Sequence, residues 1–145
     1  MPHTEGSITI NKPVDQVFAF VADGENNGKW RSGILDVKLA SERPMTVGAK
    51  YTQGMKGPGG RIPADYEIVE YIPDRKIRFQ VTAGPARPEG QFDFESTNGG
   101  THVAFSLTWE PKGLMQKWFM APMVAKQMPK EVAALENLKK VLESA

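Results

Sequence analysis

The feature that most constrains the fold is a change of hydrophobic period near residue 114. Before it, short segments alternate apolar and polar residues, which is the two-residue period of strands with one buried face. After it, apolar residues recur at helical spacing up to Leu142. A helix from Met115 to Leu142 would be about 40 Å long at ~1.5 Å per residue. Pro122 and Pro129 are expected to kink it or to split off a first segment. The sequence therefore predicts a block of strands followed by one long helix.

The alternating segments are separated by short connections rich in glycine, proline, asparagine and aspartate. We expect strands at residues 7–10, 34–41, 48–55, 63–71, 76–82, 91–95 and 101–110. Short links favour antiparallel pairing, because a parallel crossover needs a dozen or more residues. Two short helices follow the first strand, at 13–22 with Asn11 as a cap and at 26–32. The predicted class is α+β, with an antiparallel sheet of six to seven strands and a long C-terminal helix.

Composition excludes several classes of protein. The 145 residues fit a single domain over 1–145, and we expect 1–6 to be a flexible N-terminus. With no cysteine, disulfides, thiolate metal sites and a cysteine nucleophile are excluded. A net charge of +1 gives no electrostatic case for nucleic acid or an anionic membrane. The longest apolar run, 17–22, is too short to span a bilayer, and no signal-peptide pattern is present. We therefore expect a cytoplasmic protein with no nucleic-acid partner and no integral membrane segment.

The sequence contains no compact catalytic or metal-binding motif. His3 and His102 are the only histidines, and His102 is expected to face solvent because it alternates with the inward residue Val103. No cluster has metal-ligand spacing, so no metal and no cofactor are expected. The segment 57–60 lacks the following Lys-Ser/Thr of a phosphate-binding loop, and we interpret it as a flexible hairpin.

One face of the expected sheet collects aromatic and methionine side chains, and the helices add others. The inward positions on the strands are Tyr51, Met55, Tyr66, Phe79, Phe92, Phe94, Phe105 and Trp109. The helical positions are Trp30, Met115, Trp118, Phe119 and Met123. Such side chains suit an adaptable apolar pocket. The alternative is that they simply fill the core, which is the usual role of inward apolar residues.

Four stretches, taken in order, resemble a known superfamily. They are 8–18 (ITINKPVDQVF), the pair Lys29-Trp30, 66–77 (YEIVEYIPDRKI) and 99–103 (GGTHV). The chain resembles START and birch-pollen-allergen-like (SRPBCC) proteins, in particular the bacterial polyketide cyclase/dehydrase and lipid-transport branch. The resemblance implies a helix-grip fold, in which the curved sheet wraps the long helix and leaves a ligand cavity between them. Members bind lipids, sterols, quinones or polyketides and only some are enzymes, so the fold does not determine the function.

Four polar side chains occupy strand positions that are expected to face inward. They are the catalytic candidates: Tyr51, Gln53, Tyr66 and Glu70. They could orient a ligand carbonyl or transfer a proton, although a buried tyrosine hydroxyl is often only a structural group. Since no paired acid and base is apparent, we expect a carrier or sensor of a lipid, quinone or polyketide-like molecule. The alternatives are a lyase-type polyketide cyclase or dehydratase and a protein-interaction module. Loops 56–61 and 84–90 are expected to act as lids.

Overall fold

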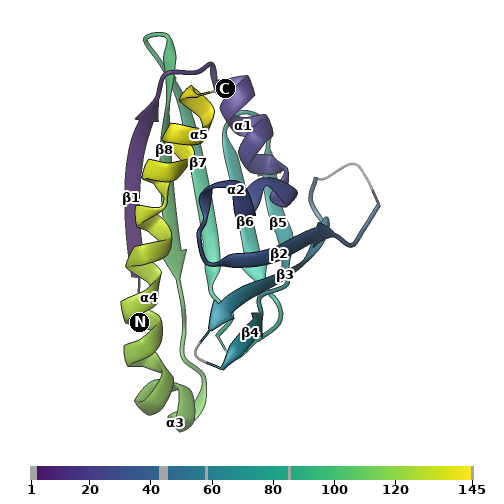
Figure 1. The fold of residues 1–145 in the computed structure, drawn as a ribbon, viewed down its shortest axis with the longest axis vertical. Helices are drawn as coiled ribbons and strands as arrows, with labels where there is room; N and C mark the ends of the chain where they lie inside the picture. Colours follow the sequence, from purple (N-terminus) through teal and green to yellow (C-terminus); the bar gives the residue numbers. More distant parts are fainter. Residues whose placement is uncertain (1–2, 43–45, 58, 85, 145) are drawn as a thin grey trace.

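The computed structural model describes residues 3–42, 46–57, 59–84 and 86–144. Its strands (Figure 1) are β1 (His3–Ile10), β2 (Ile34–Leu39), β3 (Lys50–Gly57), β4 (Gly60–Pro63), β5 (Tyr66–Ile72), β6 (Lys76–Val81), β7 (Glu89–Thr97) and β8 (Gly100–Thr108). Its helical elements are α1 (Val14–Ala22), η1 (Gly24–Asn26), α2 (Asn27–Trp30), α3 (Gly113–Met115), η2 (Gln116–Met120), α4 (Ala121–Ala133) and α5 (Leu135–Glu143).

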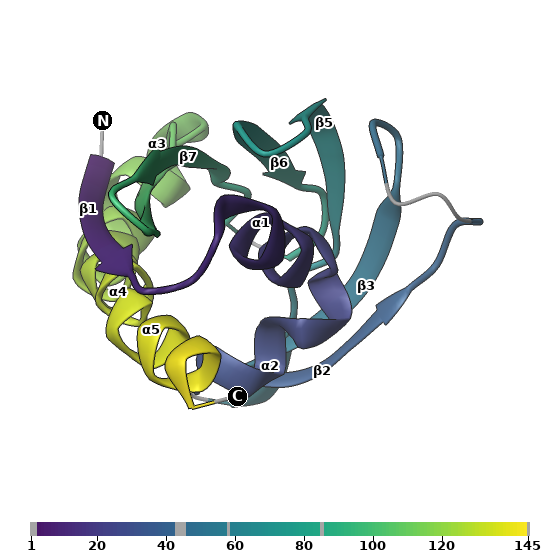
Figure 2. The same ribbon diagram turned by 90° about the horizontal axis from the view of Figure 1, so that it is seen from above.

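All eight strands belong to one antiparallel sheet. Seven follow the path β1-β8-β7-β6-β5-β3-β2, and the short β4 pairs with β3 off this path. Figure 2 shows the sheet curling around the helices, with α4 and α5 running beside β1. The predicted α+β class and helix-grip architecture are confirmed. The eighth strand comes from residues 60–63, of which we expected 60–61 in a loop.

The first strand is longer than predicted. His3–Gly6 pair with Thr108–Phe105 of β8, so the expected flexible N-terminus is wrong for residues 3–6. Residues 1–2 lie outside the described residues. A Cβ at Gly6 would lie 2.6 Å from Cγ1 of Val132. Glycine at this position therefore lets α4 approach β1 closely.

The first helix begins without the predicted cap. Pro13 occupies the cap position of α1 and no side chain caps the helix. The backbone N–H of Asn11 instead donates to Oε2 of Glu143, at 2.8 Å. The ring of Phe18 in α1 packs edge-on against Phe94, with centroids 5.1 Å apart. The first helix thus covers one end of the inner sheet face.

The C-terminal segment is helical from Gly113 to Glu143 and is not divided by its prolines. Pro122 lies in the first turn of α4, directly after the π-helical stretch η2, and Pro129 lies inside α4. The two irregularities are the π-helical stretch η2 and a turn at Ala134. Short π-helical stretches often mark functional positions in longer helices.

Candidate functional site at the inner face of the sheet

Aromatic side chains line the face of the sheet that meets the helices. Seven of the eight predicted strand positions are at most 7% exposed: Tyr51, Tyr66, Phe79, Phe92, Phe94, Phe105 and Trp109. The rings of Phe92 and Phe105 stack with centroids 4.2 Å apart, and Phe79 lies within 6.4 Å of both. Their inward position is as predicted. Because the rings contact one another, they also form part of the core; Met55 is half-buried at its edge.

Asn27 joins two of the four predicted polar candidates in a buried hydrogen-bond network. Its Nδ2 donates to Oη of Tyr66 at 2.9 Å and to Oε1 of Gln53 at 3.0 Å. Nε2 of Gln53 donates in turn to the carbonyl of Ala64 at 3.3 Å. We did not predict Asn27 from the sequence, although it lies three residues before Trp30 and therefore on the same face of a short helix.

The two buried tyrosines stack on each other, and their hydroxyls bond within the protein. Their centroids are 4.9 Å apart, and Oη of Tyr51 accepts the backbone N–H of Gly24 at 3.3 Å. Burial raises the pKa of Tyr66 well above its ordinary value, the nearby Tyr51 adds to the rise, and the Asn27 hydrogen bond opposes it. Tyr66 therefore stays protonated at neutral pH. A Cβ at Gly24 would lie against Oη of Tyr66, so this network requires glycine there.

Glu70 does not reach the interior, and its predicted place among the inward candidates is wrong. The register between β5 and β6 shifts between Ile68 and Glu70, which is a β-bulge that turns Glu70 to the outer face. There its Oε1 accepts Nε–H of Arg78 at 3.1 Å. Tyr71 takes the inward side instead, with its ring 5.3 Å from that of Phe18.

Trp30 places an unpaired donor in the interior. Its ring meets Phe92 edge-on at 6.1 Å. Among the buried side-chain atoms described, Nε1 of Trp30 is the one without a hydrogen-bond partner. An unpaired buried N–H costs free energy, so a carbonyl, hydroxyl or water oxygen would be stabilised next to it. Trp30 is thus the inward polar group that the protein leaves available.

An ion pair ties the second short helix to the long helix. Nη2 of Arg31 lies 2.9 Å from Oε2 of Glu131 in α4, and both side chains are close to nine-tenths buried. Neither residue stood out in the sequence, since only the fold brings positions 31 and 131 together. The pair places a carboxylate and a guanidinium at the boundary between sheet and helix.

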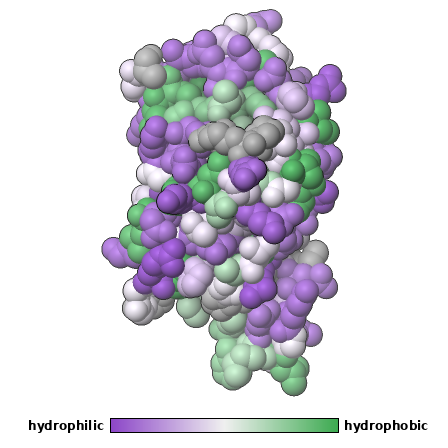
Figure 3. Space-filling model, turned by 90° about the vertical axis from the view of Figure 1, so that its right-hand side faces the viewer, coloured by the Kyte–Doolittle hydropathy of each residue, from purple (hydrophilic) through white to green (hydrophobic). Residues whose placement is uncertain are grey.

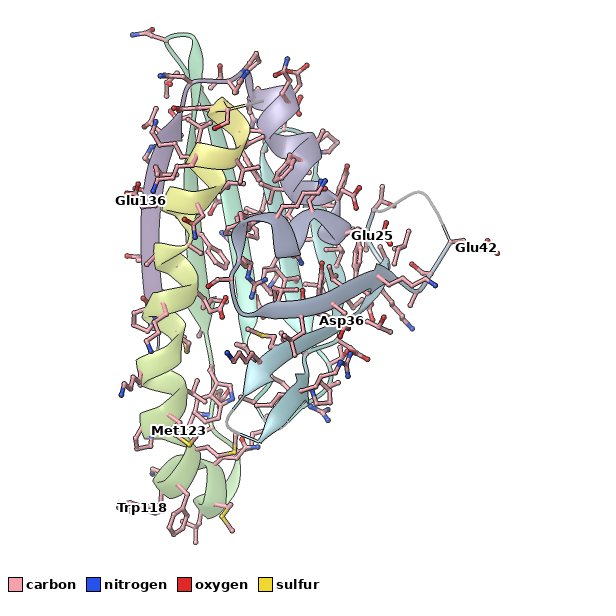
Figure 4. The ribbon with its side chains drawn as sticks, viewed as in Figure 1. Glu25, Asp36, Glu42, Trp118, Met123 and Glu136 are labelled. Atoms are coloured by element: carbon pink, nitrogen blue, oxygen red, sulfur yellow. The ribbon has the colours of Figure 1, made fainter. Side chains whose placement is uncertain are left out.

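The residues expected to complete the pocket from the helix lie on the surface. Trp118, Phe119 and Met123 are 68%, 71% and 59% exposed, and Figure 4 shows Trp118 and Met123 at the lower end of the molecule. Their expected inward position is therefore wrong. The helix instead packs Met120 and Val124 against the core. Both faces of this segment are apolar, so helical periodicity alone did not identify the inner one.

A cleft of about 840 Å³ opens where β6 and β8 end, between the chain after β6 and the start of the long helix. The buried residues Val81 and Trp109 line its inner part. Its rim is charged and includes Arg87, Glu89, Glu110 and Lys112. Of the apolar residues predicted to border a pocket, Trp109 lines this cleft. Val81 and Trp109 are the residues of its lining that also belong to the buried core.

The described residues support neither a metal site nor a spanning helix. No group of three or more His, Cys, Asp or Glu side chains among them is arranged to hold a metal ion. Within the same part of the chain, no helix combines the length and apolar character needed to cross a membrane.

The curled sheet, the gripped helix and the aromatic inner face define a START-like helix-grip protein. The sequence matches the model of the family described as "Polyketide cyclase / dehydrase and lipid transport" over residues 1–143. The chain belongs to this family. Among curated proteins, none matches it in sequence.

Solved structures share this fold at low sequence identity. The protein TTHA0849 from Thermus thermophilus has a TM-score of 0.80 at 19% identity, with 99% of each chain covered. A START superfamily protein from Mycobacterium smegmatis has a TM-score of 0.80 at 14% identity, with 98% of this chain and 97% of that chain covered. The di-domain ARO/CYC BexL from the BE-7585A biosynthetic pathway has a TM-score of 0.70 at 19% identity. The match covers all of this chain and 48% of that chain. Identities this low establish the fold alone.

Proposed function

We propose that this protein binds a hydrophobic small molecule, such as a lipid, quinone or polyketide-like compound, between its sheet and its C-terminal helix. The observation that carries the proposal is a cleft whose lining includes Trp109 and Val81, two residues of the buried core. Its volume of about 840 Å³ lies within the usual range for small-ligand sites. Belonging to a family that includes lipid-transport proteins supports a role as carrier or sensor.

The bound molecule would carry an oxygen as well as an apolar body. A carbonyl or hydroxyl could accept the N–H of Trp30, which has no partner among the described residues. Because Phe92 and Phe105 are cross-strand neighbours buried in the core, such a ligand has to displace the helix to lie against them. The π-helical stretch η2 and the turn at Ala134 are the positions at which the helix would bend.

A polyketide cyclase is the second candidate, and one observation favours it. The interior boundary holds a carboxylate, Glu131, about one-tenth exposed and paired with Arg31. A cyclase would need a positioned acid or base of this kind, worth ~10²–10⁴-fold in rate. The hydroxyls of Tyr51 and Tyr66 already bond within the protein, and Glu70 faces outward. The carrier hypothesis therefore remains the first.

The carrier proposal is tested by titrating the protein with a fluorescent fatty acid. Thr82→Trp places a large side chain at the rim of the cleft and should weaken binding by about tenfold or more, because it obstructs entry. The matched control Thr52→Trp changes another exposed threonine, on β3 and away from the cleft, and should leave affinity within about twofold. Equal affinity in both variants would contradict the proposed entrance.

The cyclase alternative is tested with a poly-β-keto substrate. Glu131→Gln should lower turnover by ~10²-fold or more if this carboxylate is the acid or base, whereas Glu70→Gln on the outer face should not. We expect no turnover in the unmodified protein. Measurable turnover that only Glu131→Gln removes would establish the enzyme instead of the carrier.

A further inference from the structure

The start of the long helix carries an exposed apolar surface, here called the apolar tip. It consists of five of the nine exposed large hydrophobic side chains among the described residues: Leu114, Met115, Trp118, Phe119 and Met123. Several are four residues apart, as in 114–118, 115–119 and 119–123, which places them side by side on one face. The other face of the segment packs on the core through Met120 and Val124. Figure 3 shows apolar side chains gathered at this lower end of the molecule.

The segment that carries the apolar tip is basic throughout. Residues 111–130 contain four lysines and neither aspartate nor glutamate: Lys112, Lys117, Lys126 and Lys130. All four are exposed, and the ion pairs found among the described residues include none of them. The rest of the chain therefore carries a net −3, the difference between +1 overall and +4 in this segment. The balanced composition thus conceals a basic end, which corrects our conclusion that charge gives no case for an anionic membrane.

We propose that the apolar tip docks on the surface of a membrane that contains anionic phospholipids. Tryptophan, phenylalanine and leucine beside lysines are the side chains that insert at the boundary of headgroups and acyl chains while cations contact phosphates. A second copy of the chain is a poorer occupant, since joining two tips would bring eight lysines together without carboxylates in either segment.

The cleft opens at the same end of the molecule. Lys112 and Gln116, which belong to the basic segment, also line that cleft. Docking by the tip would therefore present the entrance to the lipid surface. The proposal itself stands on the exposure and charge of residues 111–130 and needs no ligand inside the protein, so each proposal can fail without the other.

Sedimentation with vesicles tests the docking. Without added ligand, the protein should bind vesicles of phosphatidylcholine and phosphatidylglycerol, bind pure phosphatidylcholine far less, and dissociate as salt rises. Trp118 is 68% exposed, whereas Trp30 and Trp109 are each 2% exposed. A shift of tryptophan emission to shorter wavelength on binding should therefore disappear in Trp118→Phe.

Matched variants separate the tip from the rest of the surface. Replacing both Trp118 and Phe119 by alanine should weaken vesicle binding about tenfold or more, and Lys117→Gln about fivefold. Leu35→Ala and Lys38→Gln change exposed residues of β2 and should have no effect. These substitutions are all at exposed positions, so unchanged thermal unfolding verifies the fold.

Two results would overturn the docking proposal. One is equal binding to both kinds of vesicle, or binding to neither. The other is a concentration-dependent dimer that the alanine pair at 118 and 119 dissociates in the absence of vesicles, which would assign the tip to a second copy of the chain.

Discussion

At the scale of single residues, the hydroxyl of Tyr66 is the most clearly determined polar group of the interior. Asn27 donates to it at 2.9 Å, and the tyrosine is 6% exposed. Tyr66→Phe leaves that amide N–H buried without a partner, so we expect the free energy of unfolding to fall by about 1–3 kcal/mol. Urea denaturation measures it. The control Tyr71→Phe removes a hydroxyl with no hydrogen bond among the described residues and should cost less than ~0.5 kcal/mol. Equal costs would contradict the network.

The raised pKa of Tyr66 leads to a second prediction, which concerns how the free energy of unfolding depends on pH. Above about pH 10 the unfolded chain releases a tyrosine proton that the folded protein retains. The unfolded state then binds fewer protons, so the free energy of unfolding decreases as pH rises beyond this value. Urea midpoints across this alkaline range should fall less steeply in Tyr66→Phe than in the unmodified protein. Parallel curves would show that another group is responsible.

Alternation predicted the inward side chains wherever the strand pairing is regular. Tyr51, Gln53 and Tyr66 are at most 6% exposed, as their positions in the strands indicated. The prediction for Glu70 is wrong because one β-bulge reverses which residues of β5 face inward. Nothing in the local sequence of this stretch indicates the bulge. Asn27 was missed because its partners come from strands 26 and 39 residues away.

At the scale of elements, the contact between β1 and α4 depends on a residue without a side chain. Gly6→Ala would place a Cβ 2.6 Å from Cγ1 of Val132, and we expect it to destabilise the fold by about 1–3 kcal/mol. Adding Val132→Ala provides space, so the double variant should lose less than the sum of the single losses. The control Gly33→Ala meets its nearest atom at 3.7 Å and should not couple to position 132. Additive losses would contradict a tight contact.

The type of each element was easier to predict than its first and last residues or the face that it turns towards the core. The hydrophobic period predicted the bounds of β6 to within one residue and the start of the long helix to within two residues. His3–Gly6 lack apolar alternation, and their strand forms because β8 offers an unpaired edge far along the chain. In the helix the apolar residues occupy two faces, so which one meets the sheet depends on tertiary packing.

At the scale of the whole molecule, the proposed ligand entry would require movement at the cleft while the sheet stays intact. We predict that the amides of residues 84, 86 and 87 exchange hydrogen faster than those of β6 and β8, and more slowly once a fatty acid is added. The other expected lid, 56–61, is different because Lys56 pairs with Arg61 in the hairpin of β3 and β4. Pro58 of this loop lies outside the described residues. Exchange in this hairpin should not respond to ligand. Equal protection at both places would contradict a local entrance.

The central claim is that an apolar ligand lies inside the molecule, and the three tryptophans sample its three relevant places. Trp109 lines the cleft, Trp30 is buried in the interior, and Trp118 is on the surface. The direct measurement is ¹⁹F NMR of protein labelled with 5-fluorotryptophan, assigned by single Trp→Phe variants and titrated with a fatty acid in the absence of vesicles. The account predicts that the signals of Trp109 and Trp30 shift together while that of Trp118 does not. A shift of Trp118 alone, or of no signal at saturating ligand, would contradict it.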